Sequence, residues 1–187
     1  MRALLLDALG TLVALEPPAP ILRRELAERF DIDVTEAQAA SALAAEIAYY
    51  RAHLDEGRDV RSLVALRRRC AEALRTALPP KNSIAELENA ALTNALLASL
   101  RFRAFPDVRP ALLTARATGW RVVVASNWDV SLHDVLARLR LASLLDGIVT
   151  SAQAGARKPA PAVFEQALRI VQVGPEDAIH VGDSLEE

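Results

Sequence analysis

The chain has 187 residues, which suits one domain of ordinary size or a core with a modest insertion. Its formal net charge is only −2, and acidic and basic residues are mixed along the sequence, so we expect no nucleic-acid surface. No apolar run approaches the roughly 20 residues of a membrane span, and Asp7 interrupts the apolar start without a small-residue cleavage site after it. The single cysteine, Cys70, excludes an internal disulfide. These features predict a soluble cytoplasmic protein that binds neither nucleic acid nor a membrane.

The first predicted element is a short strand at the amino terminus. The apolar run of residues 4–6 stops at Asp7, a pattern typical of a parallel strand buried on both faces. Residues 16–20 then contain three prolines, and we expect neither a strand nor a helix to continue through them.

Helical patterns fill the region from about residue 21 to residue 100, which carries no strand signal. Thr35 with Gln38 has the spacing of a capping box, in which two side chains satisfy backbone groups at a helix amino terminus. Ser83 with Glu86 repeats that spacing. The apolar spacing predicts four helices, over residues 21–30, 35–56, 60–78 and 83–96.

Strands and helices alternate from residue 105 onward, where Asp107 can cap a helix and Gly119 can end it. The pattern predicts helices over 107–118, 132–139 and 160–171, and strands over 120–125, over 147–150 and from residue 178. Such alternation is typical of a parallel sheet with right-handed crossovers. The sequence therefore predicts an α/β fold, with a sheet core of residues 1–15 and 101–187 and an α-helical insertion of residues 16–100.

Polar or acidic residues follow three of the predicted strands: Asp7, then Ser126 with Asn127, and finally Asp183. In an open α/β sheet, ligands bind at the carboxyl ends of the strands. Two carboxylates that meet at one edge repel each other unless a cation lies between them. Mg²⁺ is the natural candidate, because it prefers oxygen ligands and is usually held by one or two carboxylates together with phosphate and water. We therefore expect Asp7 and Asp183 to bind Mg²⁺, although Asp7 taken alone is more simply a residue that caps a turn.

Ser126, Asn127 and Lys158 are candidate anion-binding residues. The first two offer a hydroxyl and amide donors, although a Ser-Asn turn is common without any function. Lys158 precedes Pro159 and a predicted helix, and the dipole at a helix amino terminus disfavours positive charge. A nearby anionic site would compensate for that charge, and the alternative is a solvated lysine in a loop.

Four segments, in this order, resemble the motifs of haloacid dehalogenase-like (HAD) hydrolases. They are residues 7–11 after the first strand, the strand that ends at Ser126-Asn127, the pair Lys158-Pro159, and the segment 180–184 with the sequence His-Val-Gly-Asp-Ser. The helices of residues 16–100 resemble the α-helical cap that many family members insert after the first motif. The resemblance covers essentially the whole chain and implies a Rossmann-like parallel sheet with an inserted cap.

The resemblance also implies a hydrolase that acts on a small phosphate ester. In such an enzyme Asp7 attacks phosphorus and forms an aspartyl-phosphate. Ser126 and the amide of Asn127 hold the transferring group, and Lys158 neutralises charge around the nucleophile and the phosphate. The implied ligands of Mg²⁺ are Asp7, Asp183 and the backbone carbonyl of Leu9. This division of labour suits phosphoryl transfer, in which catalysis is mostly positioning and charge stabilisation.

Leu9 departs from the pattern of the family's phosphatases, which have an aspartate there as general acid and base. Losing such a group typically slows a reaction about 10²–10⁴-fold, so the phosphatase hypothesis predicts a preference for good leaving groups. Metal-independent 2-haloacid dehalogenases of the same superfamily usually have a tyrosine at that position, and Gly182-Asp183 is the phosphatase-like form of the last motif. A dehalogenase-type hydrolase and a catalytically inactive HAD-like binding protein stay open as alternatives.

The family's last motif usually continues to another acid four or five residues after Asp183, followed by a helix and a further strand. The sequence stops at Glu187, which stands at the four-residue spacing and is a further candidate metal ligand. The alternative is that the true ligand lies beyond a truncation. The resemblance therefore implies a sheet without that edge strand and covering helix, which leaves apolar surface exposed unless a partner covers it. A homo-oligomer that covers this edge is one expectation.

Four residues of the insertion are candidate substrate contacts. Tyr49 and His53 are four positions apart and so share a helix face. Tyr50 and Arg58 are nearby in the sequence. The alternative interpretation is that all four belong to an ordinary cap surface.

Overall fold

The computed structural model describes residues 1–80 and 82–184. The chain divides into two compact units. The sheet unit comprises Met1–Ala14, Asp55–Val60 and the chain from Phe102 onward, and the helical unit comprises Leu15–Leu54 and Arg61–Arg101. Among the helices of the described residues, none has both the length and the hydropathy that a membrane span requires.

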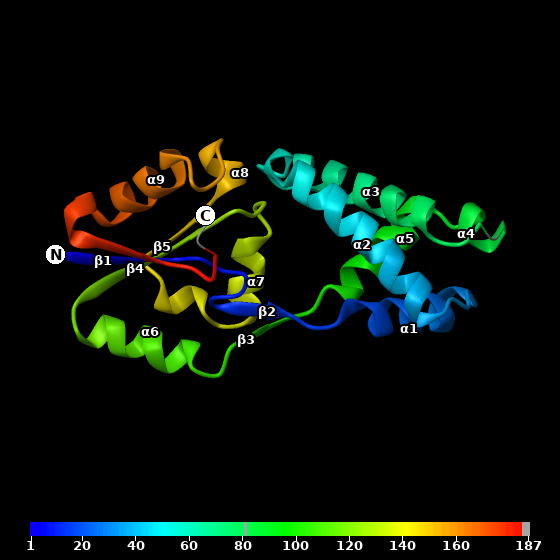
Figure 1. The fold of residues 1–187 in the computed structure, drawn as a ribbon, viewed down its shortest axis with the longest axis horizontal. Coiled ribbons are helices and arrows are strands. Elements are labelled where there is room, and N and C mark those ends of the chain that lie inside the picture. The colour runs from blue at the N-terminus through cyan, green and yellow to red at the C-terminus, as the bar shows by residue number, and fades with distance from the viewer. Residues whose placement is uncertain (81, 185–187) are drawn as a thin grey trace. The chain divides into compact units, whose positions relative to one another are not determined.

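A four-stranded parallel sheet forms the centre of the sheet unit (Figure 1). Its strands are β1 (Arg2–Leu6), β4 (Trp120–Ser126), β5 (Gly147–Thr150) and β6 (Ala178–Val181), in the order β5-β4-β1-β6. Leu5 of β1 pairs with Val123 of β4 on one side and with His180 of β6 on the other. The parallel α/β architecture predicted from the sequence is therefore confirmed.

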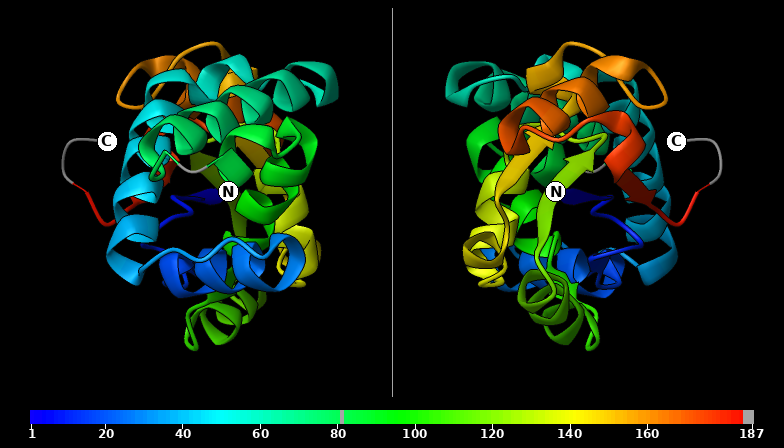
Figure 2. Two further views of the ribbon diagram at one scale, coloured as in Figure 1. Left: turned by 90° about the vertical axis from the view of Figure 1, so that its right-hand side faces the viewer. Right: turned by 90° about the vertical axis from the view of Figure 1, so that its left-hand side faces the viewer.

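Helices cover both faces of this sheet, which explains its apolar strands (Figure 2). The covering helices are α9 (Pro161–Val171) on one face and α6 (Val108–Ala117) with α7 (Leu132–Arg138) on the other. Successive residues of a strand point to opposite faces. Leu5 and Val123 accordingly pack in the cluster around α9, whereas Leu6 and Val124 pack in the cluster around α6 and α7. Because both faces are covered, β1 and β4 need apolar residues at consecutive positions.

Three very short elements of the chain did not give a sequence signal. β2 (Val13–Leu15) and β3 (Phe102–Ala104) form a second, two-stranded sheet, just before and just after the helical insertion in the sequence. A one-turn helix, α8 (Ser151–Ala154), follows β5. Strands of three residues and a helix of a single turn are too short to show a period of 2 or 3.6 residues.

The helical unit is built from α1 (Pro18–Phe30), α2 (Glu36–His53), α3 (Val60–Ala77), α4 (Asn82–Glu86) and α5 (Asn89–Ser99). A short 3-10 helix, Leu54–Glu56, follows α2. The helices share one apolar core, in which Leu22, Leu66 and Leu92 are fully buried. The predicted capping box of α2 is confirmed, because Thr35 Oγ1 accepts from Gln38 N at 3.2 Å and Thr35 N donates to Gln38 Oε1 at 2.9 Å.

The second predicted capping box is wrong. Ser83 lies within α4, which ends at Glu86, and α5 begins three residues later instead of continuing the same helix. Arg75 of α3 donates hydrogen bonds to the carbonyl oxygens of Ile84 and Leu87, the latter at 2.7 Å. These bonds satisfy carbonyl groups at the helix break. A contact from another helix therefore stabilises an interruption that the local pattern does not show.

β2 ends before the proline-rich segment 16–20, but the next helix begins inside this segment and not at residue 21 as predicted. α1 begins at Pro18, the second of the three prolines. Proline is tolerated in the first turn of a helix, because the backbone N–H that it lacks would have no helical acceptor there.

Candidate active site

Asp7 lies directly after β1, at the carboxyl edge of the sheet. Its backbone N–H donates to the Val181 carbonyl of β6 at 2.9 Å. Its Oδ1 lies 2.8 Å from Lys158 Nζ, and the two residues are only 5% and 4% exposed. Burying a charged group is costly without a partner of opposite charge. The ion pair therefore accounts for the burial of both charges.

Asn127 holds the backbone of Lys158 in place. Its Oδ1 accepts a hydrogen bond from Lys158 N at 2.7 Å, and its Nδ2 donates to Lys158 O at 3.2 Å. The side-chain amide thus acts as a clamp on the residue that carries the buried ammonium. The phosphate contact predicted for Asn127 stays a prediction.

Ser126 ends β4 and lies at the same sheet edge as Asp7. β4 is next to β1, and the register pairs Leu6 with Val124, so the two strands reach their carboxyl ends together. Ser126 is 2% exposed. A hydroxyl at this edge can donate a hydrogen bond to an oxyanion.

Asp183 follows β6, on the other side of β1. Its carboxylate packs against Gly10, where a side-chain carbon would lie 2.1 Å from Asp183 Oδ2. Gly10 also has φ +83°, a backbone conformation that favours glycine. Gly10 therefore leaves the space that the carboxylate occupies.

Asp7 and Asp183 stand on either side of a switch in strand order. The chain runs from β1 to β4 and β5 on one side of the sheet, and then returns to β6 on the other side of β1. Ligands of open α/β sheets bind at such a switch, outside the carboxyl ends of the strands.

Asp7 and Asp183 are the two carboxylates that the sequence predicts to bind Mg²⁺. Within residues 1–80 and 82–184, no cluster of three or more His, Cys, Asp or Glu side chains is arranged to hold a metal. Mg²⁺ usually takes one or two carboxylates and completes its coordination with water and phosphate. The Mg²⁺ site predicted at Asp7, Asp183 and the carbonyl of Leu9 stays a prediction. Glu187, the further candidate, lies outside the described residues.

The loop 55–60 contributes contacts that the sequence did not predict. It connects α2 to α3 but belongs to the sheet unit. Asp55 accepts a hydrogen bond from Ser151 Oγ at 2.6 Å and forms an ion pair with Arg157, the neighbour of Lys158. These contacts join residues 96 and 102 positions apart, so no local pattern could reveal them.

Tyr49 and His53 share a face of α2, as predicted, and contact each other. Their rings stack with centroids 4.1 Å apart, and Arg69 Nε donates to the Tyr49 hydroxyl at 3.0 Å. Tyr50 packs against the core of the helical unit, whereas Arg58 lies in the sheet unit with an exposed side chain. A substrate contact by any of these residues stays a prediction.

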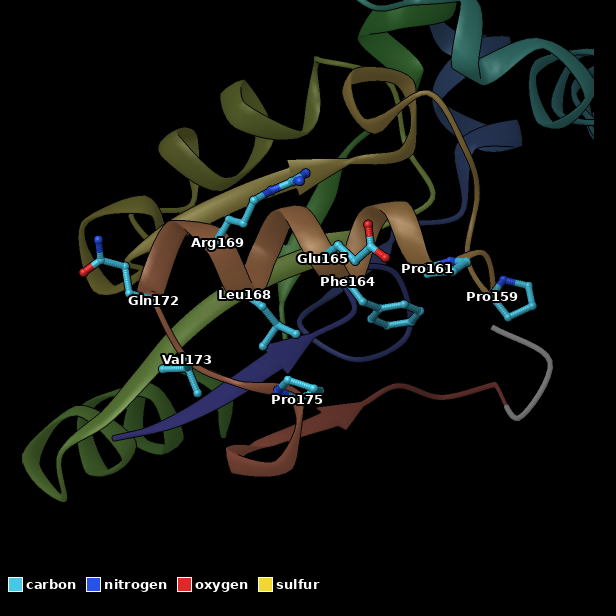
Figure 3. Close-up of a pocket in the computed structure, with 9 residues that line it drawn as sticks. All are labelled: Pro159, Pro161, Phe164, Glu165, Leu168, Arg169, Gln172, Val173 and Pro175. Atoms are coloured by element: carbon cyan, nitrogen blue, oxygen red, sulfur yellow. The ribbon is translucent and has the colours of Figure 1, made fainter.

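An open apolar groove runs along α9 (Figure 3). Phe164, Leu168 and Pro175 are among the residues that line it. Pro159, the neighbour of Lys158, also lines the groove, but none of the site residues predicted from the sequence does. The buried charges at the sheet edge, and not this groove, therefore mark the candidate active site.

Comparisons with known proteins point to one family. The model of the haloacid dehalogenase-like hydrolase family matches residues 1–187. Haloacid dehalogenase-like hydrolase domain-containing protein 3 of Xenopus laevis is 38% identical over 78 residues, which are 42% of this chain and 32% of that protein. Glyceraldehyde 3-phosphate phosphatase of Methanopyrus kandleri is 36% identical over 84 residues, which are 44% of this chain and 36% of that protein. The chain thus matches about a third of the length of these curated relatives.

A solved structure has the same fold over the whole chain. A HAD phosphatase from Thermococcus onnurineus aligns with a TM-score of 0.64 and 22% sequence identity, covering 100% of this chain and 79% of that chain. At this identity the likeness concerns the fold alone. The predicted fold class, a HAD-like parallel sheet, is thereby confirmed.

Proposed function

Because the chain belongs to the haloacid dehalogenase-like hydrolase family, we propose that it is a Mg²⁺-dependent phosphatase acting on a small phosphate ester. The observation that carries the proposal is the buried ion pair of Asp7 and Lys158 at the carboxyl edge of a parallel sheet. The name of the related glyceraldehyde 3-phosphate phosphatase supports a substrate of this class.

The chain's own residues can carry both halves of the reaction. Lys158 engages Asp7 Oδ1, and the other carboxylate oxygen, Oδ2, attacks phosphorus. The bond between phosphorus and the ester oxygen breaks, and the released alkoxide takes a proton from water. Water then attacks the phosphorus of the aspartyl-phosphate, which releases inorganic phosphate and restores the carboxylate. Ser126 donates a hydrogen bond to the phosphoryl oxygens in both steps.

Asp7, Asp183 and the carbonyl of Leu9 would hold Mg²⁺ beside this nucleophile. When bound, the ion neutralises negative charge on the phosphoryl oxygens. Lys158 adds a second positive charge, and its side chain is 0% exposed, so water does not screen it.

Leu9 is expected to restrict the substrate to esters with good leaving groups. Its side chain is 41% exposed and carries no proton donor or acceptor. A general acid typically contributes about 10²–10⁴-fold to such a rate. Aryl and acyl phosphates need little protonation as they leave, so their turnover should exceed that of alkyl phosphates.

A screen of phosphate esters, with and without Mg²⁺, tests the proposal. We expect Mg²⁺-dependent release of inorganic phosphate from aryl or acyl phosphates, and none from the Asp7→Asn variant. Absence of metal-dependent release from every ester would contradict it. Binding of Mg²⁺ or phosphate without turnover, measured by calorimetry, would instead favour a catalytically inactive binding protein.

Leu9 weakens the phosphatase reaction without favouring the second candidate, a metal-independent 2-haloacid dehalogenase, because such enzymes usually have a tyrosine at this position and Gly182-Asp183 is the phosphatase-like form of the last motif. Leu9 lacks the carboxylate that the phosphatase reaction would use as acid and base. In this alternative Asp7 attacks the carbon that bears the halogen, halide leaves, and water hydrolyses the resulting ester. Halide release from 2-haloacids without added metal would support this candidate over the phosphatase.

A further inference from the structure

His180 of β6 carries a side chain that the proposed reaction does not use. Its Nδ1 lies 2.9 Å from the carbonyl oxygen of Leu5, and its ring meets Phe164 edge-on, with ring centroids 5.1 Å apart. A carbonyl oxygen only accepts hydrogen bonds, so Nδ1 must be the donor. In the neutral imidazole with its proton on Nδ1, the other ring nitrogen, Nε2, carries the lone pair.

This Nε2 atom is buried, and no described residue gives it a hydrogen bond. A buried acceptor without a partner destabilises the folded state. A purely apolar ring at position 180 would also pack against Phe164 but would avoid that cost. Stability alone therefore does not explain a histidine at this position.

The imidazole lies close to the segments that carry both candidate acids. A side-chain carbon at Gly182 would lie 3.5 Å from His180 Nε2 and 3.5 Å from Asp7 Cβ, so the ring and Asp7 flank the same glycine. Leu5 precedes Asp7 by two residues, and the Asp7 N–H bonds to the carbonyl of Val181, which follows His180. Moving the ring would therefore move the end of β1 relative to the segment that leads to Asp183.

We propose that His180 is a positioning residue, whose Nδ1–H bond to Leu5 holds the end of β1 against β6 and so sets the spacing of Asp7 and Asp183. This role rests on the proposed phosphatase function of that site. The unpartnered Nε2 follows from it, because a ring turned to donate through Nδ1 leaves its other nitrogen facing the interior.

Two variants of His180 distinguish the effect of its hydrogen-bond donor from the effect of its aromatic ring. His180→Asn keeps an N–H donor near the Nδ1 position, whereas His180→Phe keeps an aromatic ring without a donor. We expect the kcat of His180→Phe to fall about 10–100-fold with little change in KM, because a displaced nucleophile slows the chemical step. The kcat of His180→Asn should stay within about threefold of the native value. An unchanged kcat in His180→Phe, or equal losses in both variants, would overturn the proposal.

The melting temperature distinguishes positioning from a general structural role. His180→Phe should melt no lower than the native protein, because the lost hydrogen bond is offset by removal of the unpartnered acceptor. Phe164→Leu is the matched control, because it weakens the ring contact but leaves the bond to Leu5. This control should melt at a lower temperature with unchanged kcat. A loss of kcat in Phe164→Leu as large as in His180→Phe would show that packing, and not the donor, matters.

A measurement without substrate keeps this proposal separate from the proposed function. NMR of protein labelled with ¹⁵N-histidine should show the proton of the His180 ring on Nδ1, and amide exchange at Asp7 should be faster in His180→Phe than in His180→Asn. A proton on Nε2 would overturn the positioning role, whatever the activity. Failure of the native protein to hydrolyse any phosphate ester would contradict the phosphatase function but leave these two readouts to decide the role of His180.

Discussion

The sheet unit and the helical unit each bury a carboxylate, but in different ways. In the sheet unit, Asp7 lies 2.8 Å from the ammonium of Lys158. In the helical unit, Glu46 is 3% exposed, and burial raises its pKa to about 7, against the lowering effect of a hydrogen bond with Cys70. The helical unit thus avoids the cost of a buried charge by keeping the acid neutral below about pH 7. The nucleophile role proposed for Asp7 requires a charged carboxylate, and Lys158 provides the cation that offsets the cost of burying it.

The ion pair of the sheet unit gives the largest expected effect. Lys158→Met removes the ammonium beside the buried Asp7, and Asp7→Asn removes the carboxylate beside the buried Lys158. Each change is expected to lower the free energy of unfolding by about 3–5 kcal/mol and to abolish turnover. The double variant should be much more stable than the sum of the two losses implies, because neither charge is left alone. Urea unfolding of the four proteins measures this coupling, and additive losses would show that the two charges are independent.

Introducing a carboxylate at position 9 of the sheet unit is expected to have the next largest effect. This effect is on activity. Leu9→Asp supplies the missing proton donor at an exposed position, so the fold should tolerate it. The kcat/KM for an alkyl phosphate should rise about 10²–10⁴-fold, with a much smaller rise for an aryl phosphate. Leu9→Asn, which has the same shape but no proton to give, should change neither. Equal gains for the two substrates would mean that the new carboxylate does not act as an acid.

Glu46 is expected to affect stability and not turnover. The folded chain keeps the Glu46 proton up to about pH 7, whereas the unfolded chain loses it near pH 4.5. Unfolding therefore releases the Glu46 proton between these pH values, so the contribution of Glu46 to the free energy of unfolding falls as pH rises from 4.5 to about 7 and is level above that. Glu46→Gln removes this pH-dependent loss of stability. The variant's free energy of unfolding should exceed that of the native protein by on the order of 3 kcal/mol at about pH 8, with little difference at about pH 4.

Urea unfolding of Glu46→Gln at these two pH values measures the difference. Glu28→Gln is the matched control, because Glu28 is exposed on α1. This control variant should show no pH-dependent gain in the free energy of unfolding. Equal gains from Glu46→Gln at both pH values would mean that the helical unit does not hold this acid in its neutral form.

The smallest expected effect comes from the two capping-box patterns of the helical unit. Thr35→Ala removes a side chain that accepts a hydrogen bond from Gln38 N and should cost about 1 kcal/mol. Ser83→Ala should cost little, because Ser83 lies within α4 and caps no helix. Thermal unfolding of both variants measures the difference, and a larger loss from Ser83→Ala would contradict the helix break.

The strands and the residues at their ends could be predicted from the sequence, because the signals are local. A strand buried on both faces must be apolar at consecutive positions, and the residue that ends such a run lies at the sheet edge. The predicted strands end next to Asp7, Ser126 and Asp183, so these local signals place all three residues at one edge of the sheet. For Lys158 the same local reasoning leaves two interpretations open, a cation beside an anionic site and a solvated lysine in a loop, and the ion pair with Asp7 decides between them.

Contacts between distant side chains could not be predicted in this way. The break between α4 and α5 depends on Arg75. The hydrogen bonds to the backbone of Lys158 depend on the orientation of the Asn127 amide. The contacts of the loop 55–60 with Ser151 and Arg157 depend on Asp55. Each contact joins segments that are separated in the sequence and meet only after the chain folds. His180 is a further case, because only the register of β1 with β6 brings its ring to Leu5.

The most direct test is to look for the covalent adduct on Asp7. The native protein is mixed with an aryl phosphate and Mg²⁺, quenched in acid during turnover, digested and analysed by mass spectrometry. A phosphoryl group on the peptide that contains Asp7, and specifically on that side chain, is the predicted result. Release of phosphate while Asp7 stays unmodified at every time point, or an adduct on another residue, would contradict the account.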